Sequence, residues 1–170
     1  MSTALSPSII EVRRATKHYG RDIGIEEVTL DVRSGEVLGL LGPNGSGKTT
    51  LLRLMLGLIN FTSGRISIFG RDVSAVGKVI RSRIGYLPGD LALYDQQTVS
   101  QYLEFMMKLR RLDVMASALT LCERLKLDPA RRISDLSRGT KQKVAVVQAF
   151  MHAPELLLLD EPTSGLDPIV

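Results

Sequence analysis

Apolar and polar residues alternate in two segments near the start of the chain. Ile10 and Val12 are separated by charged residues, and Val28, Leu30 and Val32 follow the same period of two. This period is typical of strands that bury one face. We therefore expect two half-buried strands in this part of the chain.

Other segments are apolar without alternation. Residues 37–41 and 156–159 are aliphatic runs of the kind found in parallel strands covered on both faces. Two more short apolar segments predict strands over 65–69 and 84–87, and the pattern after a glycine-rich loop predicts a helix over 48–58. This half of the sequence predicts an α/β fold.

From Thr98 onward the apolar spacing changes to three and four residues. Thr98 and Gln101 have the pattern of a capping box at a helix start, and two further helices are expected over 114–127 and 140–152. We therefore expect a helical subdomain at about 98–135, inserted into one domain that spans residues 1–170. The predicted fold class is α/β, with a mixed, mainly parallel sheet, an N-terminal antiparallel part and this helical insert.

The composition is that of an ordinary globular domain. The chain has 170 residues, one cysteine and a formal net charge of +4. Its basic residues are scattered, so no nucleic-acid partner is expected. No apolar stretch approaches the roughly 20 residues that span a bilayer, and the first residues lack the features of a signal peptide. These features favour the cytoplasm.

The strongest local motif is G-P-N-G-S-G-K-T at residues 42–49, which fits G-x-x-x-x-G-K-[ST] between an apolar run and a helix. Glycines let the backbone N–H groups of such a loop turn inward towards phosphate oxygens, and the helix start adds a positive dipole end. Lys48 would face the β- and γ-phosphates, and the Thr49 hydroxyl suits Mg²⁺. The residues expected to bind the nucleotide here are Gly42, Pro43, Asn44, Gly45, Ser46, Gly47, Lys48, Thr49 and Thr50.

Two adjacent carboxylates follow the aliphatic run at 156–159. Asp160 would hold the magnesium with Thr49, and Glu161 would orient or polarise the attacking water, so Glu161 and Lys48 are the expected catalytic residues. A solvated turn after a core strand is the simpler alternative for this pair. Guanine specificity is not expected, because no N-K-x-D element is present.

In this order the motifs resemble those of the ATP-binding cassette (ABC) ATPases. Residues 136–140, L-S-R-G-T, are similar to the LSGGQ signature of that family, and residues 164–167, S-G-L-D, match its D-loop. The resemblance implies that Ser137 and Gly139 close on the γ-phosphate held by a second ATP-binding subunit in a head-to-tail dimer. It also implies that Tyr19 stacks on adenine. Helix capping by Ser137 and ordinary packing of Tyr19 remain alternatives.

The same resemblance implies an ATP-hydrolysing transporter subunit that docks on an integral membrane permease at the cytoplasmic face. Arg138 and Thr140 depart from the usual signature in a way that favours the drug and antibiotic exporters. Two other classes remain open. One is a soluble ABC-type ATPase of DNA repair or translation, and the other is a nucleotide-binding module deficient in hydrolysis.

Two departures from the family pattern bear on mechanism. Gly89 stands where the family has the glutamine of its Q-loop, leaving Asp90 as the nearest polar side chain, while Leu91, Leu93 and Tyr94 would suit a groove for a helix of the membrane subunit. No histidine follows Glu161. We therefore expect a cassette that lacks its usual C-terminal part and hydrolyses ATP slowly or not at all.

Overall fold

A computed structural model of the chain describes residues 8–162, apart from the side chains of residues 76–78. The chain divides between Arg81 and Ser82 into two compact units, each with strands and helices of its own. Among the described residues, no helix combines the length and the apolar character needed to cross a membrane.

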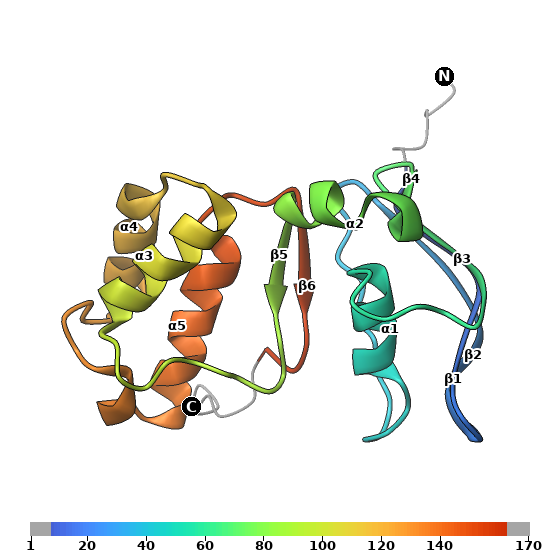
Figure 1. The fold of residues 1–170 in the computed structure, drawn as a ribbon, viewed down its shortest axis with the longest axis horizontal. Helices are drawn as coiled ribbons and strands as arrows, with labels where there is room; N and C mark the ends of the chain where they lie inside the picture. The colour runs from blue at the N-terminus through green and yellow to red at the C-terminus, as the bar shows by residue number, and fades with distance from the viewer. Residues whose placement is uncertain (1–7, 163–170) are drawn as a thin grey trace. The chain divides into compact units, whose positions relative to one another are not determined.

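The first unit contains an antiparallel sheet (Figure 1). The order of its strands is β2-β1-β3-β4, and their bounds are β1 Ser8–Tyr19, β2 Asp22–Arg33, β3 Ser63–Ile68 and β4 Arg71–Asp72. Val12 pairs with Leu30 on one side and with Ile66 on the other. The strands predicted from period two and from residues 65–69 are therefore confirmed, and the first two are longer than expected.

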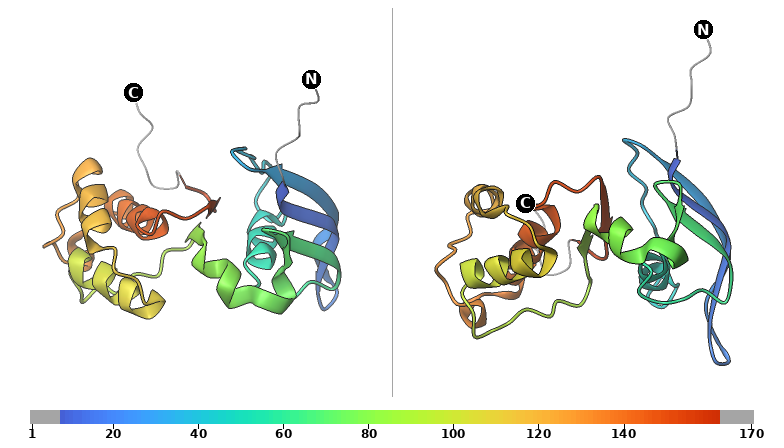
Figure 2. Two further views of the ribbon diagram at one scale, coloured as in Figure 1. Left: turned by 90° about the horizontal axis from the view of Figure 1, so that it is seen from above. Right: turned by 45° about the horizontal axis from the view of Figure 1, so that its top comes forward.

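Helix α1, Lys48–Met55, packs on β2 and β3 (Figure 2). Its buried side chains are Leu51, Leu52, Leu54 and Met55. The sheet contributes side chains such as Val12 and Ile66, both fully buried. This apolar contact fixes the helix, and with it the loop that enters the helix, on the sheet.

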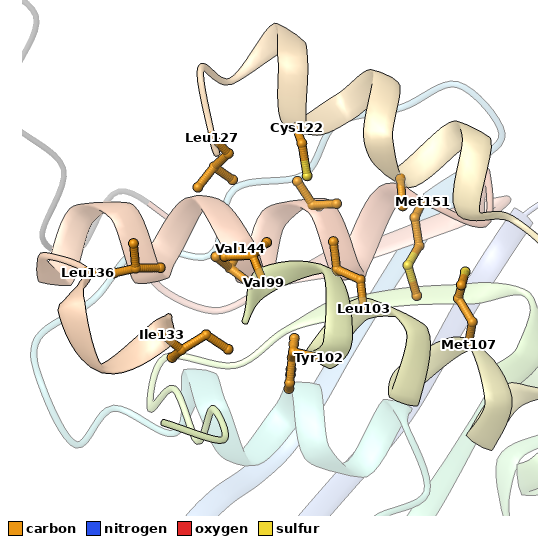
Figure 3. Close-up of a cluster of buried hydrophobic side chains, with 12 residues drawn as sticks. Val99, Tyr102, Leu103, Met107, Cys122, Leu127, Ile133, Leu136, Val144 and Met151 are labelled. Carbon is orange, nitrogen blue, oxygen red and sulfur yellow. The ribbon is translucent and has the colours of Figure 1, made fainter. Parts of the chain in front are cut away.

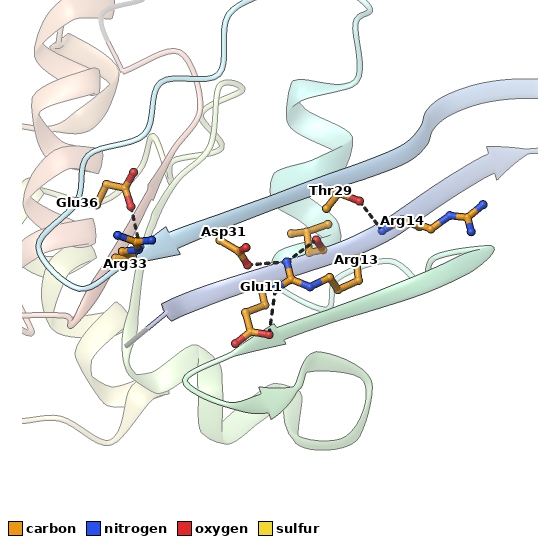
Figure 4. A network of polar contacts seen from close by, with 8 residues as sticks. Glu11, Arg13, Arg14, Thr29, Asp31, Arg33 and Glu36 are labelled. Carbon is orange, nitrogen blue, oxygen red and sulfur yellow. Dashed lines mark hydrogen bonds and ion pairs between the residues drawn. The ribbon is translucent and has the colours of Figure 1, made fainter. Parts of the chain in front are cut away.

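Charged side chains on β1 and β2 pair with one another (Figure 4). Arg13 donates to Asp31 Oδ1 at 2.6 Å and lies 3.5 Å from Glu11 Oε2. The Arg33 N–H donates to Glu36 Oε2 at 2.8 Å in the turn after β2. Because these side chains are exposed to water, their pairing contributes little to the stability of the unit.

The strand predicted over residues 37–41 is wrong. Residues 36–41 form no strand, and Val37 and Leu41 are each 96% exposed. A strand must satisfy its N–H and C=O groups with a neighbouring strand. The turn at Gly35, which has a φ of +79°, follows β2, and no strand described in this unit pairs with the run after it. The apolar composition of this run predicted a strand, but a strand also requires a partner strand.

Helix α2, Val73–Ser82, was not anticipated from the sequence. Val73 and Ile80 are buried and lie seven residues apart, which is a helical spacing. The segment is rich in β-branched residues and contains Gly77. These residue types have low helix propensity, which hid the helical pattern.

The second unit has a parallel pair of strands, β5 Ile84–Leu87 and β6 Leu156–Leu159. The sequence predicted both strands, but not that they pair with each other. Three helices lie beside the pair, α3 Val99–Arg110, α4 Met115–Arg124 and α5 Arg138–Phe150, and a 3-10 turn spans Ile133–Asp135. Helix α5 contacts β5, while α3 and α4 contact α5 (Figure 1). A Cβ on Gly85 would lie 2.2 Å from Ala149 O, so glycine permits this close approach of strand and helix.

The three helices enclose one apolar core (Figure 3). Its buried members are Val99, Tyr102, Leu103, Met107, Ala118, Cys122, Leu127, Ile133, Leu136, Val144, Val147 and Met151.

The capping box predicted at the start of α3 is confirmed, because the Gln101 N–H donates to Thr98 Oγ1 and the Thr98 N–H donates to Gln101 Oε1. Burial raises the pKa of Tyr102 to about 12, and its hydroxyl donates to Gln148 Oε1 at 2.5 Å.

Candidate nucleotide-binding site

The glycine-rich loop leads directly into α1. Gly47 is the N-cap of that helix with a left-handed φ of +89°, and Gly45 has a φ of +82°. The Ser46 N–H donates to Pro43 O at 3.2 Å, which closes the turn within the loop. The free N–H groups at the start of a helix, together with its dipole, make a favourable place for an anion.

Lys48 lies across this loop. Its Nζ donates to Gly42 O at 2.8 Å and to Pro43 O at 2.9 Å, and Ser46 Oγ is 3.5 Å away. All three acceptors are neutral, and within residues 8–162 no carboxylate pairs with the ammonium group. A cation in this position can attract a polyphosphate.

Gly24, which the sequence pattern did not single out, lies under the loop. A Cβ on Gly47 would be 2.3 Å from Gly24 O, and a Cβ on Gly24 would be 2.8 Å from Tyr19 Cε2. Tyr19 is therefore close to the strand residue on which the loop rests. Tyr19 is 46% exposed, and Lys17 Nζ lies over its ring, 5.1 Å from the centroid. A glycine inside a strand is a sign of close backbone approach. The strand predicted from Val28, Leu30 and Val32 did not extend to Gly24, so the sequence analysis missed this signal.

Replacing Gly47 with alanine is expected to displace the loop from β2, because the new Cβ would overlap Gly24 O. We expect the affinity for an ATP analogue to fall about tenfold or more, with an unfolding free energy lowered by about 1–3 kcal/mol. Gly70→Ala is the matched control, since Gly70 also has a left-handed φ, of +70°, but no atom within 4 Å of its added Cβ. Equal analogue titrations for the two variants would show that the contact with Gly24 does not shape the loop.

Asp160 and Glu161 follow β6, as predicted. Asp160 is 5% exposed, and its N–H donates to Leu87 O at 2.9 Å. Glu161 is exposed and has a left-handed φ of +47°. The two neighbouring carboxylates thus occupy different environments, which is compatible with the different roles expected for them.

Gly89 lies beside Asp160. A Cβ on Gly89 would be 3.5 Å from both Cγ and Oδ2 of Asp160, an ordinary contact distance. The loop that follows β5 therefore passes close to the Asp160 carboxylate. Asp90, the next residue, is exposed.

Ser137 is the N-cap of α5. Its Oγ accepts a hydrogen bond from the Thr140 N–H at 3.2 Å and lies 2.8 Å from Thr140 Oγ1. Gly139 was expected just ahead of this helix, but α5 begins at Arg138, so Gly139 lies in its first turn. The start was placed too late because the sequence R-G-T has weak helix propensity, and the Ser137 cap overrides it. The proposed D-loop, residues 164–167, lies outside the described residues.

A cavity of about 230 Å³ lies elsewhere in the first unit. Its lining includes Gly57, Phe61, Ser74 and Arg81, and none of the predicted site residues. The candidate nucleotide-binding residues do not line this cavity. They form an open loop, Gly42–Ser46 being exposed.

The family profile described as "ABC transporter" matches residues 25–164. The chain belongs to the ABC transporter family. The predicted fold class, a P-loop NTPase of the ABC type with an N-terminal antiparallel part, is confirmed by a solved structure described as a dimeric, post-hydrolysis ATP-binding cassette bound to ADP and Pi. That structure is 26% identical to this cassette, with a TM-score of 0.82, and the match covers 93% of this chain and 76% of the other.

Relatives of this cassette are named as transport proteins. It is 38% identical over 164 residues to the Nod factor export ATP-binding protein I of Rhizobium meliloti (strain 1021), covering 94% of this chain and 49% of that protein. It is 37% identical over 165 residues to the bacitracin transport ATP-binding protein BcrA of Bacillus licheniformis, covering 95% and 54%. The chain thus spans about half or less of the length of the curated relatives it matches.

The predicted site residues fall into two sets within this cassette. The first unit carries Tyr19 and residues 42–50, which the structure brings together through Gly24. The second unit carries Asp160 and Glu161 at the end of β6 and Ser137 and Gly139 at the start of α5. The structure places both sets, and the roles expected for their residues stay predictions.

Proposed function

We propose that this protein binds and hydrolyses Mg-ATP as the ATP-binding subunit of an ABC exporter. The observation that carries the proposal is the glycine loop at the start of α1, with the Lys48 ammonium held by two backbone carbonyls of that loop. The family membership and the names of the export and transport relatives support the same function.

In this proposal residues 42–50 bind the phosphates of ATP, and Lys48 bears on the β- and γ-phosphates. Tyr19 stacks on the adenine, because its exposed ring lies next to the strand that supports the loop. Glu161, exposed after β6, orients the attacking water and accepts its proton, so that ATP and water yield ADP and phosphate. Ser137 and Gly139 act on the γ-phosphate held by a second ATP-binding subunit.

A magnesium ion fits the oxygen donors expected here, the Thr49 hydroxyl and the Asp160 carboxylate. Within residues 8–162 there is no group of three or more His, Cys, Asp or Glu side chains placed to hold a metal by themselves. This donor set suits Mg²⁺, which is ordinarily held by one or two protein groups together with phosphates and water. When bound, the ion would neutralise part of the phosphate charge.

The proposed partners are a second ATP-binding subunit, identical or different, and an integral membrane permease. The protein would then act at the cytoplasmic face of the membrane through that permease. The test is affinity purification of the tagged protein from its native membranes, followed by ATPase assay. Recovery of a polytopic membrane protein that stimulates turnover supports the proposal. Isolation without such a protein would favour a soluble ABC-type ATPase.

The proposed docking surface for the membrane subunit is formed by Leu91, Leu93 and Tyr94, of which Tyr94 is the most exposed. Tyr94 is 54% exposed, and its ring packs edge-on against Phe105 at 5.4 Å, whereas Leu91 and Leu93 are already partly buried against the unit's core. Tyr94→Asp is expected to weaken the complex with the membrane subunit about tenfold or more, because exposed aromatics often dominate such interfaces. The measurement is recovery of that subunit in a pull-down.

The control for Tyr94→Asp is Leu109→Asp, which charges another exposed apolar position, 63% exposed, on α3. Thermal unfolding of both variants checks that the contact with Phe105 was not needed for folding. Full recovery of the membrane subunit with Tyr94→Asp would place the docking surface elsewhere.

A further inference from the structure

Asp95 and Lys141 form an ion pair between two segments of the second unit. Lys141 Nζ donates to Asp95 Oδ1 at 2.8 Å. Asp95 belongs to the loop between β5 and α3, and Lys141 lies in the first turn of α5, directly after the signature residues 136–140. The Lys141 side chain is 28% exposed and that of Asp95 is 58% exposed, so the pair is partly shielded from water.

Backbone hydrogen bonds join the same loop to the segment that leads into the signature. The Ser134 N–H donates to Asp95 O at 3.2 Å, and the Ile133 N–H donates to Gln97 O at 3.0 Å. Thr98 and Arg132 form an antiparallel bridge next to these bonds. Residues 95–98 are thus held along residues 132–134, and the ion pair extends this attachment into α5.

Lys141 is also bonded to the signature by its own backbone. The Lys141 N–H donates to Ser137 O at 2.8 Å, in the same turn in which Ser137 Oγ accepts from Thr140. The side chain of Lys141 is therefore bonded to Asp95, and its backbone N–H is bonded to Ser137. Both attachments lie in the first turn of α5.

The other end of the loop reaches the carboxylate at the end of β6. Leu87 O accepts from the Asp160 N–H at 2.9 Å, and Gly89 lies beside the Asp160 side chain. Gly89 has no side chain with which to bind a ligand. The contacts between this loop and the segment around the signature are made by later residues, Asp95, Gln97 and Thr98. Asp95 is the acidic residue of the loop that the structure pairs with α5.

We propose that Asp95 is a positioning residue, which sets the orientation of Ser137 and Gly139 by holding Lys141. This inference rests on the proposed function, in which those two residues act on the γ-phosphate bound by a second subunit. The rival role for Lys141 is direct attraction of that phosphate. The two roles predict opposite effects of removing Asp95, since losing a carboxylate would free the lysine and favour an approaching anion.

The test uses Asp95→Ala in the protein that also carries Glu161→Gln, so that ATP is not consumed. The measured quantity is the dissociation constant of the dimer in saturating Mg-ATP, by analytical ultracentrifugation. Loss of positioning raises this constant roughly two- to fivefold, the range expected for a partly exposed ion pair. An unchanged or lowered constant would overturn the proposal.

Two further variants separate positioning from loss of charge. Glu104→Ala is the matched control, because it removes a carboxylate that pairs with Lys108 on α3 at 2.6 Å and so changes the net charge equally. It is expected to leave dimerisation unchanged. Lys141→Met combined with Asp95→Ala is expected to be no worse than Lys141→Met alone, since the first change already breaks the pair. Fully additive losses would contradict the role of Asp95.

The outcome also separates this inference from the proposed function. Binding of a fluorescent ATP analogue to each single chain is expected to stay unchanged in Asp95→Ala, because the loop at residues 42–50 is untouched. If the Glu161→Gln protein does not dimerise with Mg-ATP at all, the proposed function fails and this inference fails with it. If that protein dimerises and Asp95→Ala dimerises equally well, only the inference fails.

Discussion

Replacing Lys48 with alanine is expected to weaken Mg-ATP binding roughly 10- to 100-fold. The substitution removes a cation whose hydrogen bonds to phosphate are charge-assisted, and such bonds contribute about 1.5–3 kcal/mol each. The fold should be unaffected, since Lys48 Nζ contacts only exposed groups of its own loop. The measurement is titration of a fluorescent ATP analogue with magnesium.

Arg53→Ala is the control for Lys48→Ala. Arg53 is an exposed basic residue in the last turn of the same helix, so its loss changes the net charge equally at the opposite end of α1. The affinity of the Arg53→Ala protein for the ATP analogue should match that of the unaltered protein. Equal affinities for Lys48→Ala and Arg53→Ala would remove Lys48 from the site.

Replacing Glu161 with glutamine is expected to lower the rate of ATP hydrolysis by about 100- to 10,000-fold while Mg-ATP binding persists. A positioned general base contributes about that much, and glutamine retains the shape of the side chain without its basicity. Phosphate release measured beside an ATP-analogue titration separates the two effects. This separation of rate from affinity distinguishes a catalytic carboxylate from a solvated turn.

The control for Glu161→Gln is Glu155→Gln, just before the opposite end of β6. Glu155 pairs with Arg83, with both its carboxylate oxygens at 2.5 Å from guanidinium nitrogens. Because this pair is exposed, its loss should cost little stability and leave turnover almost unchanged. Turnover that survives in Glu161→Gln, or falls equally in Glu155→Gln, would contradict the role assigned to Glu161.

The sequence was sufficient to predict those elements whose own residues favour the observed local structure. The apolar segments at β5 and β6 predicted the two strands that the structure pairs in parallel, and Thr98 with Gln101 predicted the start of α3. These signals are local, because a strand of branched aliphatics and a capping side chain carry their own structural preferences. The glycine-rich loop belongs to this class as well, since its left-handed backbone needs glycine at positions 45 and 47.

Where structure depends on distant partners, the sequence misled or was silent. Residues 37–41 are as apolar as β6, yet they form no strand, because hydrogen-bonding partners are not encoded in the run itself. Gly24 supports the glycine loop from a strand 23 positions earlier than Gly47, and Asp95 reaches Lys141 across 46 positions. No short motif contains either pair, so only the folded chain reveals them.

The proposed function requires that Mg-ATP bring two ATP-binding subunits together. The measurement that decides this is sedimentation velocity of the Glu161→Gln protein with and without Mg-ATP, with Lys48→Ala added as the binding-deficient control. We predict a dimer that forms only with Mg-ATP and only while Lys48 is present. The contradicting result is a Glu161→Gln protein that binds Mg-ATP tightly and still sediments as a monomer. It must do so both by itself and when mixed with any different ATP-binding subunit that co-purifies with the membrane permease.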